Sequence, residues 1–201
     1  MVQEREEHGW VLDFLPTGRS SERAPEPIAQ LVGEKYFTLF EVTTKPNITL
    51  SFGQRVYLGK EERPEVERIR KRIDYPELTS ASRSELVQVL RKIVESREAD
   101  FVNFFNKAGP LSIRLHQLEL IHGIGKKHLA QILEKRQEKP FDNFADLRER
   151  VTLLPDPVQI IVGRIRQELE GSEQNFLFVR PPKKDDGYGG RGGYPSRRFG
   201  R

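Results

Sequence analysis

The sequence predicts a multi-domain α+β protein, in which a small β-barrel is followed by an α-helical region and a basic tail. In the first 62 residues, short runs of β-branched, aromatic and alternating residues lie between turn residues. Beyond them, apolar residues recur at helical spacing, and the last 22 residues are rich in Gly and Arg. The expected parts are a barrel over 1–62, a helical bridge over 63–110, paired helical hairpins over 111–179 and a disordered tail over 180–201.

The composition excludes several classes of protein. The 201 residues include no cysteine, which excludes disulfides, Cys-ligated metal sites and thiol nucleophiles. No run of about 18 apolar residues occurs, and the N-terminus is acidic, so we expect a cytoplasmic protein without a membrane span or secretory signal. The net charge is +4, because the last 22 residues contribute +5 and the rest of the chain contributes −1. That concentration of charge indicates a terminal arm for a polyanionic partner.

The N-terminal region is expected to contain strands over residues 8–15, 36–44 and 54–60. These segments alternate in polarity or are rich in β-branched and aromatic residues, and polar turn segments separate them. Several short strands without a long helix favour a small barrel or curled sheet. An oligonucleotide-binding (OB)-type barrel is the first choice and another small barrel is the alternative. Four aromatic residues are candidates for base stacking or for the core: Tyr36, Phe37, Phe40 and Tyr57.

The bridge is expected to be helical. Residues 63–74 carry apolar side chains at helical spacing and a basic outer face, which indicates a solvated helix more strongly than a nucleic-acid patch. Ser82 and Glu85 have the spacing of a capping box and would open a second helix. Residues 99–107 present phenylalanines on one helical face, which is typical of a core-facing helix.

The segment 111–138 carries the most specific pattern. Its apolar spacing predicts a helix over 112–121 and another that starts near residue 126. The sequence His-Gly-Ile-Gly-Lys-Lys lies between them, with an apolar plug flanked by two conformationally free glycines. Exposed amides at the start of the second helix, together with the lysines, would favour a phosphate. The candidate nucleic-acid-binding residues here are His122, Gly123, Ile124, Gly125, Lys126, Lys127 and His128.

Residues 118–127 (LELIHGIGKK) resemble the helix–hairpin–helix motif, whose Gly-apolar-Gly hairpin binds nucleic-acid backbone without reading bases. An ordinary helical hairpin capped by its glycines is the alternative. Residues 141–147 resemble the connector between paired motifs of this kind, which implies a second hairpin. There, Pro-Asp-Pro at 155–157 replaces the glycines, removes amide donors and adds a carboxylate. Asp156 as N-cap and Pro157 at the first helical position explain these residues, so the second hairpin would brace the first.

The tail combines arginines, glycines and aromatic residues. Its six glycines and three prolines preclude a packed core, so we expect disorder over 180–201. The segment resembles the arginine–glycine-rich segments of RNA-binding proteins, in which arginine pairs with phosphate and stacks on bases. A solubilising linker is the alternative. The candidate nucleic-acid-binding residues of the tail are Arg191, Arg197 and Arg198.

The sequence offers no catalytic or cofactor site. The four histidines form no metal-binding pattern, and no acidic pair accompanies them. The Gly-Ile-Gly run lacks the third glycine and the preceding strand of a dinucleotide-binding loop. We therefore expect neither catalysis nor a cofactor nor a metal ion.

The order of a β domain, a helical bridge, paired hairpins and a basic tail resembles a family of uncharacterised archaeal proteins that are predicted to bind RNA. The resemblance covers essentially the full chain and implies an OB-like N-terminal barrel. The expected function is non-catalytic, largely sequence-independent nucleic-acid binding, with RNA preferred, in RNA processing or translation alongside the ribosome or RNA-processing proteins. The alternatives are a DNA-binding repair or recombination accessory and a protein-interaction scaffold. The oligomeric state is not predicted.

Overall fold

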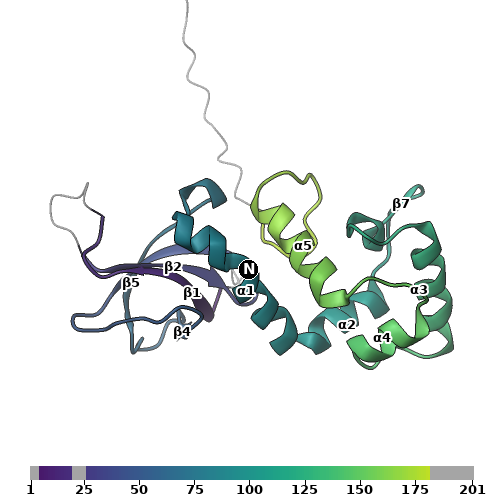
Figure 1. Ribbon diagram of the computed structural model, residues 1–201, viewed down its shortest axis with the longest axis horizontal. Coiled ribbons are helices and arrows are strands. Elements are labelled where there is room, and N and C mark those ends of the chain that lie inside the picture. Colours follow the sequence, from purple (N-terminus) through teal and green to yellow (C-terminus); the bar gives the residue numbers. More distant parts are fainter. Residues whose placement is uncertain (1–4, 20–25, 182–201) are drawn as a thin grey trace, which may run out of the picture.

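The computed structural model describes residues 5–19 and 26–181. A curled β-sheet lies at one end of an elongated molecule, and most of the helices lie at the other end (Figure 1). The longest helix, α1 (Ser80–Ser96), connects the two ends and packs on both β1 and α5. The mixed α+β class and the N-terminal position of the large sheet are confirmed.

Five antiparallel strands form the large sheet in the order β4-β1-β2-β3-β5. The strands are β1 His8–Leu15, β2 Ile28–Gly33, β3 Leu39–Thr44, β4 Arg55–Tyr57 and β5 Val66–Arg72. Among the described residues, β4 and β5 do not pair with each other. The sheet is therefore an open, curled half-barrel, which is one of the two forms, a small barrel or a curled sheet, that the sequence favoured.

Each face of the sheet buries a hydrophobic cluster. On one face, side chains of the strands pack against Leu50 and Leu58, in the segments that flank β4. The second cluster combines sheet residues such as Leu12 and Val32 with residues from all five α-helices. Because this second cluster is continuous, the two ends of the molecule share one core.

Residues 66–72 form a strand, so the helix predicted over 63–74 is wrong. β5 pairs with β3, but its pairing skips Glu67 and Arg70, which leaves the register shifted at two places. Each shift adds one unpaired residue to β5, as in a β-bulge. The apolar residues Val66 and Ile69 therefore stand three apart in a strand, which is the spacing that a helix would show. The bulges explain why the pattern indicated the wrong element.

Four of the five described α-helices lie where the sequence predicted helices, and the fifth, α4 Phe144–Arg150, lies where a connector was expected. Thr79 is the N-cap of α1, and its hydroxyl accepts the N–H of Ser82 at 3.0 Å. The cap therefore lies three residues before the predicted Ser82. The phenylalanine stripe is in the core, as expected, with Phe101 and Phe105 buried. The other elements in this part are η1 Tyr75–Glu77, α2 Glu98–Lys107, α3 Lys126–Glu138, α4 Phe144–Arg150 and α5 Pro157–Leu169.

The helix predicted over 112–121 is also wrong. The segment forms a small hairpin, β6 Pro110–Ser112 and β7 Leu115–His116, followed by the short 3-10 helix η2 Gln117–Leu120. His116 starts η2, because its ring Nδ1 accepts the N–H of Leu118 at 3.1 Å and its own N–H donates to the Glu119 carboxylate at 2.9 Å. Such local bonds compete with a continuous helix through the same residues.

Candidate nucleic-acid interface

Residues 121–125 form a tight turn between η2 and α3, which we call the first turn. The N–H of Ile124 donates to the carbonyl of Ile121 at 3.0 Å. Gly123 adopts a φ of +98°, a conformation that glycine adopts without strain. Ile124 is only 4% exposed, so it fills the space between the helices as the sequence predicted.

The first turn presents the N-terminus of α3 to solvent. Gly125 is the N-cap, and the first intrahelical bond runs from the N–H of Leu129 to the Gly125 carbonyl at 2.9 Å. The N–H groups of residues 126–128 therefore have no acceptor within the helix. No side chain among the described residues caps this end, and a Cβ on Gly125 would meet none of their atoms within 4 Å. These amides are accessible to an anion.

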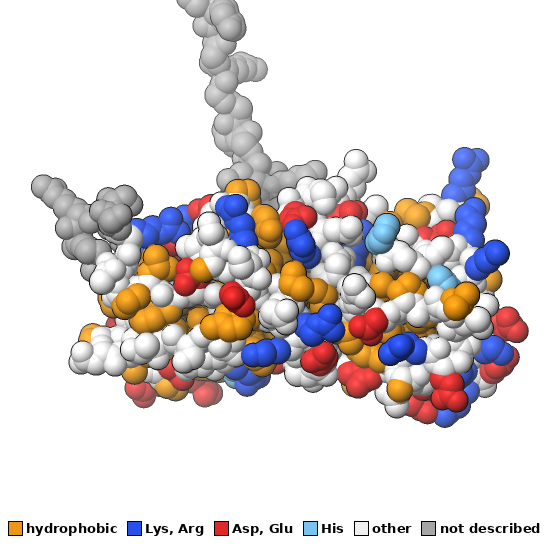
Figure 2. Space-filling model, in the orientation of Figure 1, with side chains coloured by type: hydrophobic (Ala, Val, Ile, Leu, Met, Phe, Trp, Pro, Cys, Tyr) orange, Lys and Arg blue, Asp and Glu red, His pale blue; other side chains and the backbone are white. Residues whose placement is uncertain are grey.

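Lys126 and Lys127 add positive charge at the same place. Both are exposed, and neither forms an ion pair with another described residue. Figure 2 shows Lys and Arg side chains, together with Asp and Glu, at the end of the molecule where β7 and α3 lie. The helix dipole and the two ammonium groups act in the same direction, so the local field attracts a negatively charged ligand.

The histidines near the first turn differ in their roles. His128 Nδ1 lies 3.0 Å from the carbonyl oxygen of Gly123, so its ring connects α3 to the turn. His122 is exposed. His116 is buried, and burial, reinforced by the nearby Arg136 guanidinium, lowers the pKa of its imidazole. Of the three, His122 and His128 are therefore the ones accessible to a ligand.

A second turn, residues 151–155, repeats the backbone pattern of the first turn. The N–H of Leu154 donates to the Val151 carbonyl at 3.3 Å, and Leu154 is 8% exposed. Leu153 has a φ of +59°. Leu153 and Leu154 therefore match the first glycine and the apolar plug of the first turn, and Pro155 takes the place of the second glycine.

This match corrects the position expected for the second hairpin. The counterpart of Gly-Ile-Gly is Leu-Leu-Pro at 153–155, rather than Pro-Asp-Pro at 155–157. Asp156 is the N-cap of α5 and Pro157 its first residue, as the sequence indicated. Asp156 also lies 3.9 Å from the guanidinium of Arg91 on α1. Pro157, the first residue of α5, lacks the N–H that Lys126 offers at the same position of α3, because proline has no N–H.

The two turns are in contact. A Cβ on Gly123 would lie 3.3 Å from Pro155 Cγ and 3.4 Å from Ile160 Cγ2. From α3, the side-chain oxygen of Gln131 accepts the N–H of Thr152 at 3.0 Å. The second turn therefore supports the backbone of the first turn, and glycine at position 123 permits their close approach.

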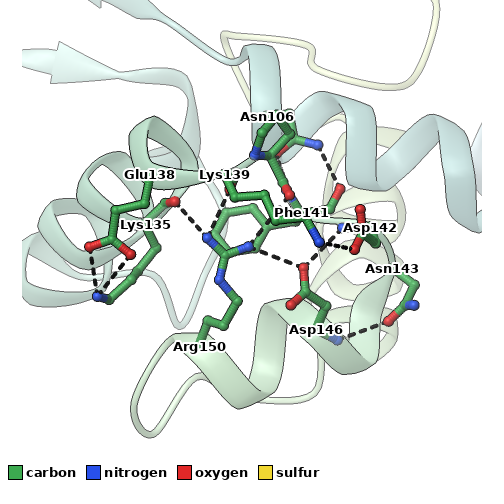
Figure 3. A network of polar contacts seen from close by, with 10 residues as sticks. Asn106, Lys135, Glu138, Lys139, Phe141, Asp142, Asn143, Asp146 and Arg150 are labelled. Carbon is green, nitrogen blue, oxygen red and sulfur yellow. Dashed lines mark hydrogen bonds and ion pairs between the residues drawn. The ribbon is translucent and has the colours of Figure 1, made fainter.

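Arg150 fixes the far end of α3 (Figure 3). Its guanidinium donates to the carbonyls of Lys135 and Lys139 at 2.6 and 2.8 Å, which satisfies the C-terminal end of the helix. It also contacts Asp146 at 3.1 Å and lies 4.7 Å from the ring centroid of Phe141. The N–H of Asp142, together with Arg150, holds the pKa of Asp146 below its ordinary value. Arg150 is thus a structural cation that orients α3 against α4.

A buried ion pair attaches the C-terminal segment next to the first turn. The Arg164 guanidinium, 2% exposed, contacts Glu168 at 2.8 Å and donates to the carbonyl of Leu120 at 2.8 Å. Glu168 in turn accepts the N–H groups of residues 177–179. The segment then reaches the sheet, where Arg180 lies 4.1 Å from the ring centroid of Tyr36. The tail candidates Arg191, Arg197 and Arg198 lie outside the described residues.

The four aromatic residues that were candidates for base stacking are buried or contact other side chains of the protein. Phe37 and Phe40 are buried in the core. Tyr57 makes an edge contact with His8 at 5.4 Å between ring centroids, and Tyr36 stacks with Arg180. The described residues contain no group of three or more side chains that could hold a metal ion, and none of their helices is long and apolar enough to cross a membrane.

Three comparisons relate the chain to known proteins. A family model described as "Protein of unknown function (DUF655)" matches residues 5–180. The chain is 41% identical over 180 residues to the uncharacterised protein MJ0038 of Methanocaldococcus jannaschii. The aligned region covers 89% of this chain and 82% of that protein. The crystal structure of Af1531 from Archaeoglobus fulgidus, titled with the same family, matches with a TM-score of 0.80 and 39% identity. That match covers 87% of this chain and all of the other.

Proposed function

The chain belongs to the DUF655 family, and we propose that it is a non-catalytic, largely sequence-independent nucleic-acid-binding protein that holds the phosphate backbone at the first turn. The observation that carries the proposal is the uncapped N-terminus of α3, flanked by the exposed Lys126 and Lys127. Phosphate oxygens accept hydrogen bonds from such amides and are attracted by the helix dipole. Backbone contacts of this kind position a protein on nucleic acid without reading its sequence.

The paired turns support a finer assignment to tandem helix–hairpin–helix motifs, of which only the first keeps its glycines. The matched backbone of the turns at 121–125 and 151–155, and their mutual packing, support it. The 3-10 helix η2 takes the place of the first helix, which departs from the motif. An OB-like second surface on the curled sheet stays a prediction of the sequence and forms no part of this proposal. A preference for RNA, a role in RNA processing or translation, and a cytoplasmic location remain predictions of the sequence.

A binding experiment tests the proposal directly. Fluorescence anisotropy would measure the affinity of the full chain for single- and double-stranded RNA and DNA at two salt concentrations. A truncation after residue 181 keeps Arg180 on Tyr36 and removes the rest of the tail. Binding by the truncated chain supports the first turn as a recognition surface, and the preferred polymer separates an RNA role from DNA repair. No binding by the full chain, even at low salt, would contradict the proposal and favour a protein scaffold.

Gly125→Asp is the sharpest single variant. The added side chain enters open space, and Asp is a favoured N-cap, so the fold should be retained. Its carboxylate would occupy the amides and repel phosphate, so we expect the dissociation constant to rise at least about tenfold, in line with the loss of one or two charge-assisted hydrogen bonds. Ala81→Asp is the matched control, because it adds the same charge at the exposed N-terminal end of α1, where Thr79 bonds to Asp13 of β1 on the sheet side of the molecule.

A further inference from the structure

Leu153 is the unexpected residue of the second turn. Its backbone lies in the left-handed region, which few side chains adopt, and 89% of the residue is exposed. The buried Leu154 already fills the interior of this turn. A glycine at position 153 would suit the backbone better and would expose less apolar surface. The stability of the fold therefore does not explain why this position holds a leucine.

Leu153 belongs to the turn that packs against the first turn, which carries the groups proposed to bind phosphate. Pro155, two residues further along the chain, packs against Gly123 of the first turn. Thr152, the residue before Leu153, forms a hydrogen bond with Gln131 of α3. This helix begins with the two exposed lysines. An exposed apolar side chain thus lies beside a positively charged, amide-rich turn. A ligand that fits both must carry an anionic group next to an apolar surface.

Nucleic acid has this combination, because a sugar and a base adjoin every phosphate. Proteins that approach duplexes from the minor groove use leucine and similar side chains against sugars and base steps. We propose that Leu153 makes an apolar contact with the sugar or base beside the phosphate held by the first turn. The inference rests on the proposed function and assigns the second turn a role in binding as well as in support. The first turn binds the charge of the nucleotide, and the second turn binds its apolar part.

The test compares full-length Leu153→Gly with the natural chain. The probe is a fluorescein-labelled RNA duplex of about 20 base pairs, a length that exceeds the ≈16 base pairs spanned by a common duplex-binding domain, and anisotropy is measured over a series of salt concentrations. We expect the dissociation constant to rise about 5- to 50-fold at every salt concentration, as for the loss of one partly buried leucine. The slope of affinity against salt should not change, because the substitution removes no cation.

Two controls isolate the contact. Glycine suits the backbone of residue 153, so circular dichroism and the urea midpoint should show a folded protein, and a loss of affinity is then not a loss of fold. Phe52→Ala removes another exposed apolar side chain, in the loop between β3 and β4 of the sheet, and should leave the affinity unchanged.

The outcomes separate this inference from the proposed function. If Leu153→Gly binds the duplex as tightly as the natural chain while Gly125→Asp binds weakly, the apolar contact is absent and a protein partner would better explain the exposed leucine. A change in the salt slope of Leu153→Gly would also overturn the inference, because it would indicate displaced lysines. If the natural chain itself binds neither RNA nor DNA at low salt, the proposed function has failed.

Discussion

Lys126 and Lys127 occupy the first two positions of α3, where the helix dipole is positive and an ammonium group gains nothing for the helix itself. Neither lysine has an ion-pair partner among the residues that the structure describes. The position at the positive end of the dipole is unfavourable for the isolated helix, and it becomes favourable when an anion binds. At the scale of single residues, this pair is the clearest indication of a ligand.

Each lysine that contacts a phosphate contributes to the salt dependence of binding. Replacing Lys126 or Lys127 by Ala should lower the slope of log affinity against log salt by up to about one unit per residue. The measurement is anisotropy with a labelled RNA at four or more salt concentrations. Lys60→Ala, an exposed lysine on the sheet side, serves as the control and should leave the slope unchanged. If both lysine variants keep the slope of the natural chain, neither lysine contacts a phosphate.

Residue identity predicted half of the site. Gly-Ile-Gly indicated the first turn, because two glycines around one apolar residue, just before a helix, are typical of a tight turn with a buried plug. Leu-Leu-Pro at 153–155 could not be recognised in the same way, since none of the residues that mark the motif is present. The match is visible only in the φ of Leu153 and in the bond from Leu154 to Val151.

At the scale of elements, the sequence predicted the helices and strands whose apolar residues follow a single regular period. The helices α1, α2, α3 and α5 follow a regular stripe, and β1 alternates. β5 was mistaken because two bulges give it a three-residue spacing. β2, buried throughout, has no alternation that would mark it as a strand. The segment 112–121 was mistaken because its capping bonds at His116 override its leucine spacing.

The Arg150 network is an element-scale contact, because it joins the end of α3 to the start of α4 (Figure 3). Arg150→Ala should lower the free energy of unfolding by about 2–4 kcal/mol, since carbonyls at the end of α3 lose charge-assisted donors. Arg150→Lys should recover little, because one ammonium cannot reproduce the planar fork. Urea unfolding followed by circular dichroism measures the loss.

Arg148 provides the control for this prediction. It is exposed on the same helix and forms no ion pair with another described residue. Arg148→Ala should change the free energy of unfolding by less than about 0.5 kcal/mol, as is usual for such surface sites. Similar losses for Arg148→Ala and Arg150→Ala would mean that the network contributes nothing specific.

At the scale of the whole molecule, the sheet and the helices should unfold together. One hydrophobic cluster spans both, and the C-terminal segment returns from α5 to the sheet at Tyr36. Trp10, the only tryptophan, lies in β1 and reports on the sheet, whereas circular dichroism reports mainly on the helices. We expect the two signals to share one urea midpoint, as in a cooperative two-state transition.

Glu168→Ala tests the same cooperativity. It removes the buried carboxylate that pairs with Arg164 and accepts three backbone N–H groups, although Glu173 still lies 2.9 Å from Arg164. Breaking such a buried pair typically costs about 3–5 kcal/mol. Both signals should then shift to a lower midpoint by the same amount. A shift of the circular dichroism signal alone, with the Trp10 signal unchanged, would show that the two ends unfold independently.

The openness of the sheet has a consequence for how copies of the protein meet. An unpaired strand edge can template pairing with a strand of another molecule, and long flat edges are prone to aggregation. Here one edge, β4, is only three residues long. The other edge, β5, is bent by its two bulges and carries exposed charges at Arg68, Lys71 and Arg72. The irregularities that disguised β5 in the sequence thus disfavour the growth of an open sheet into an intermolecular one.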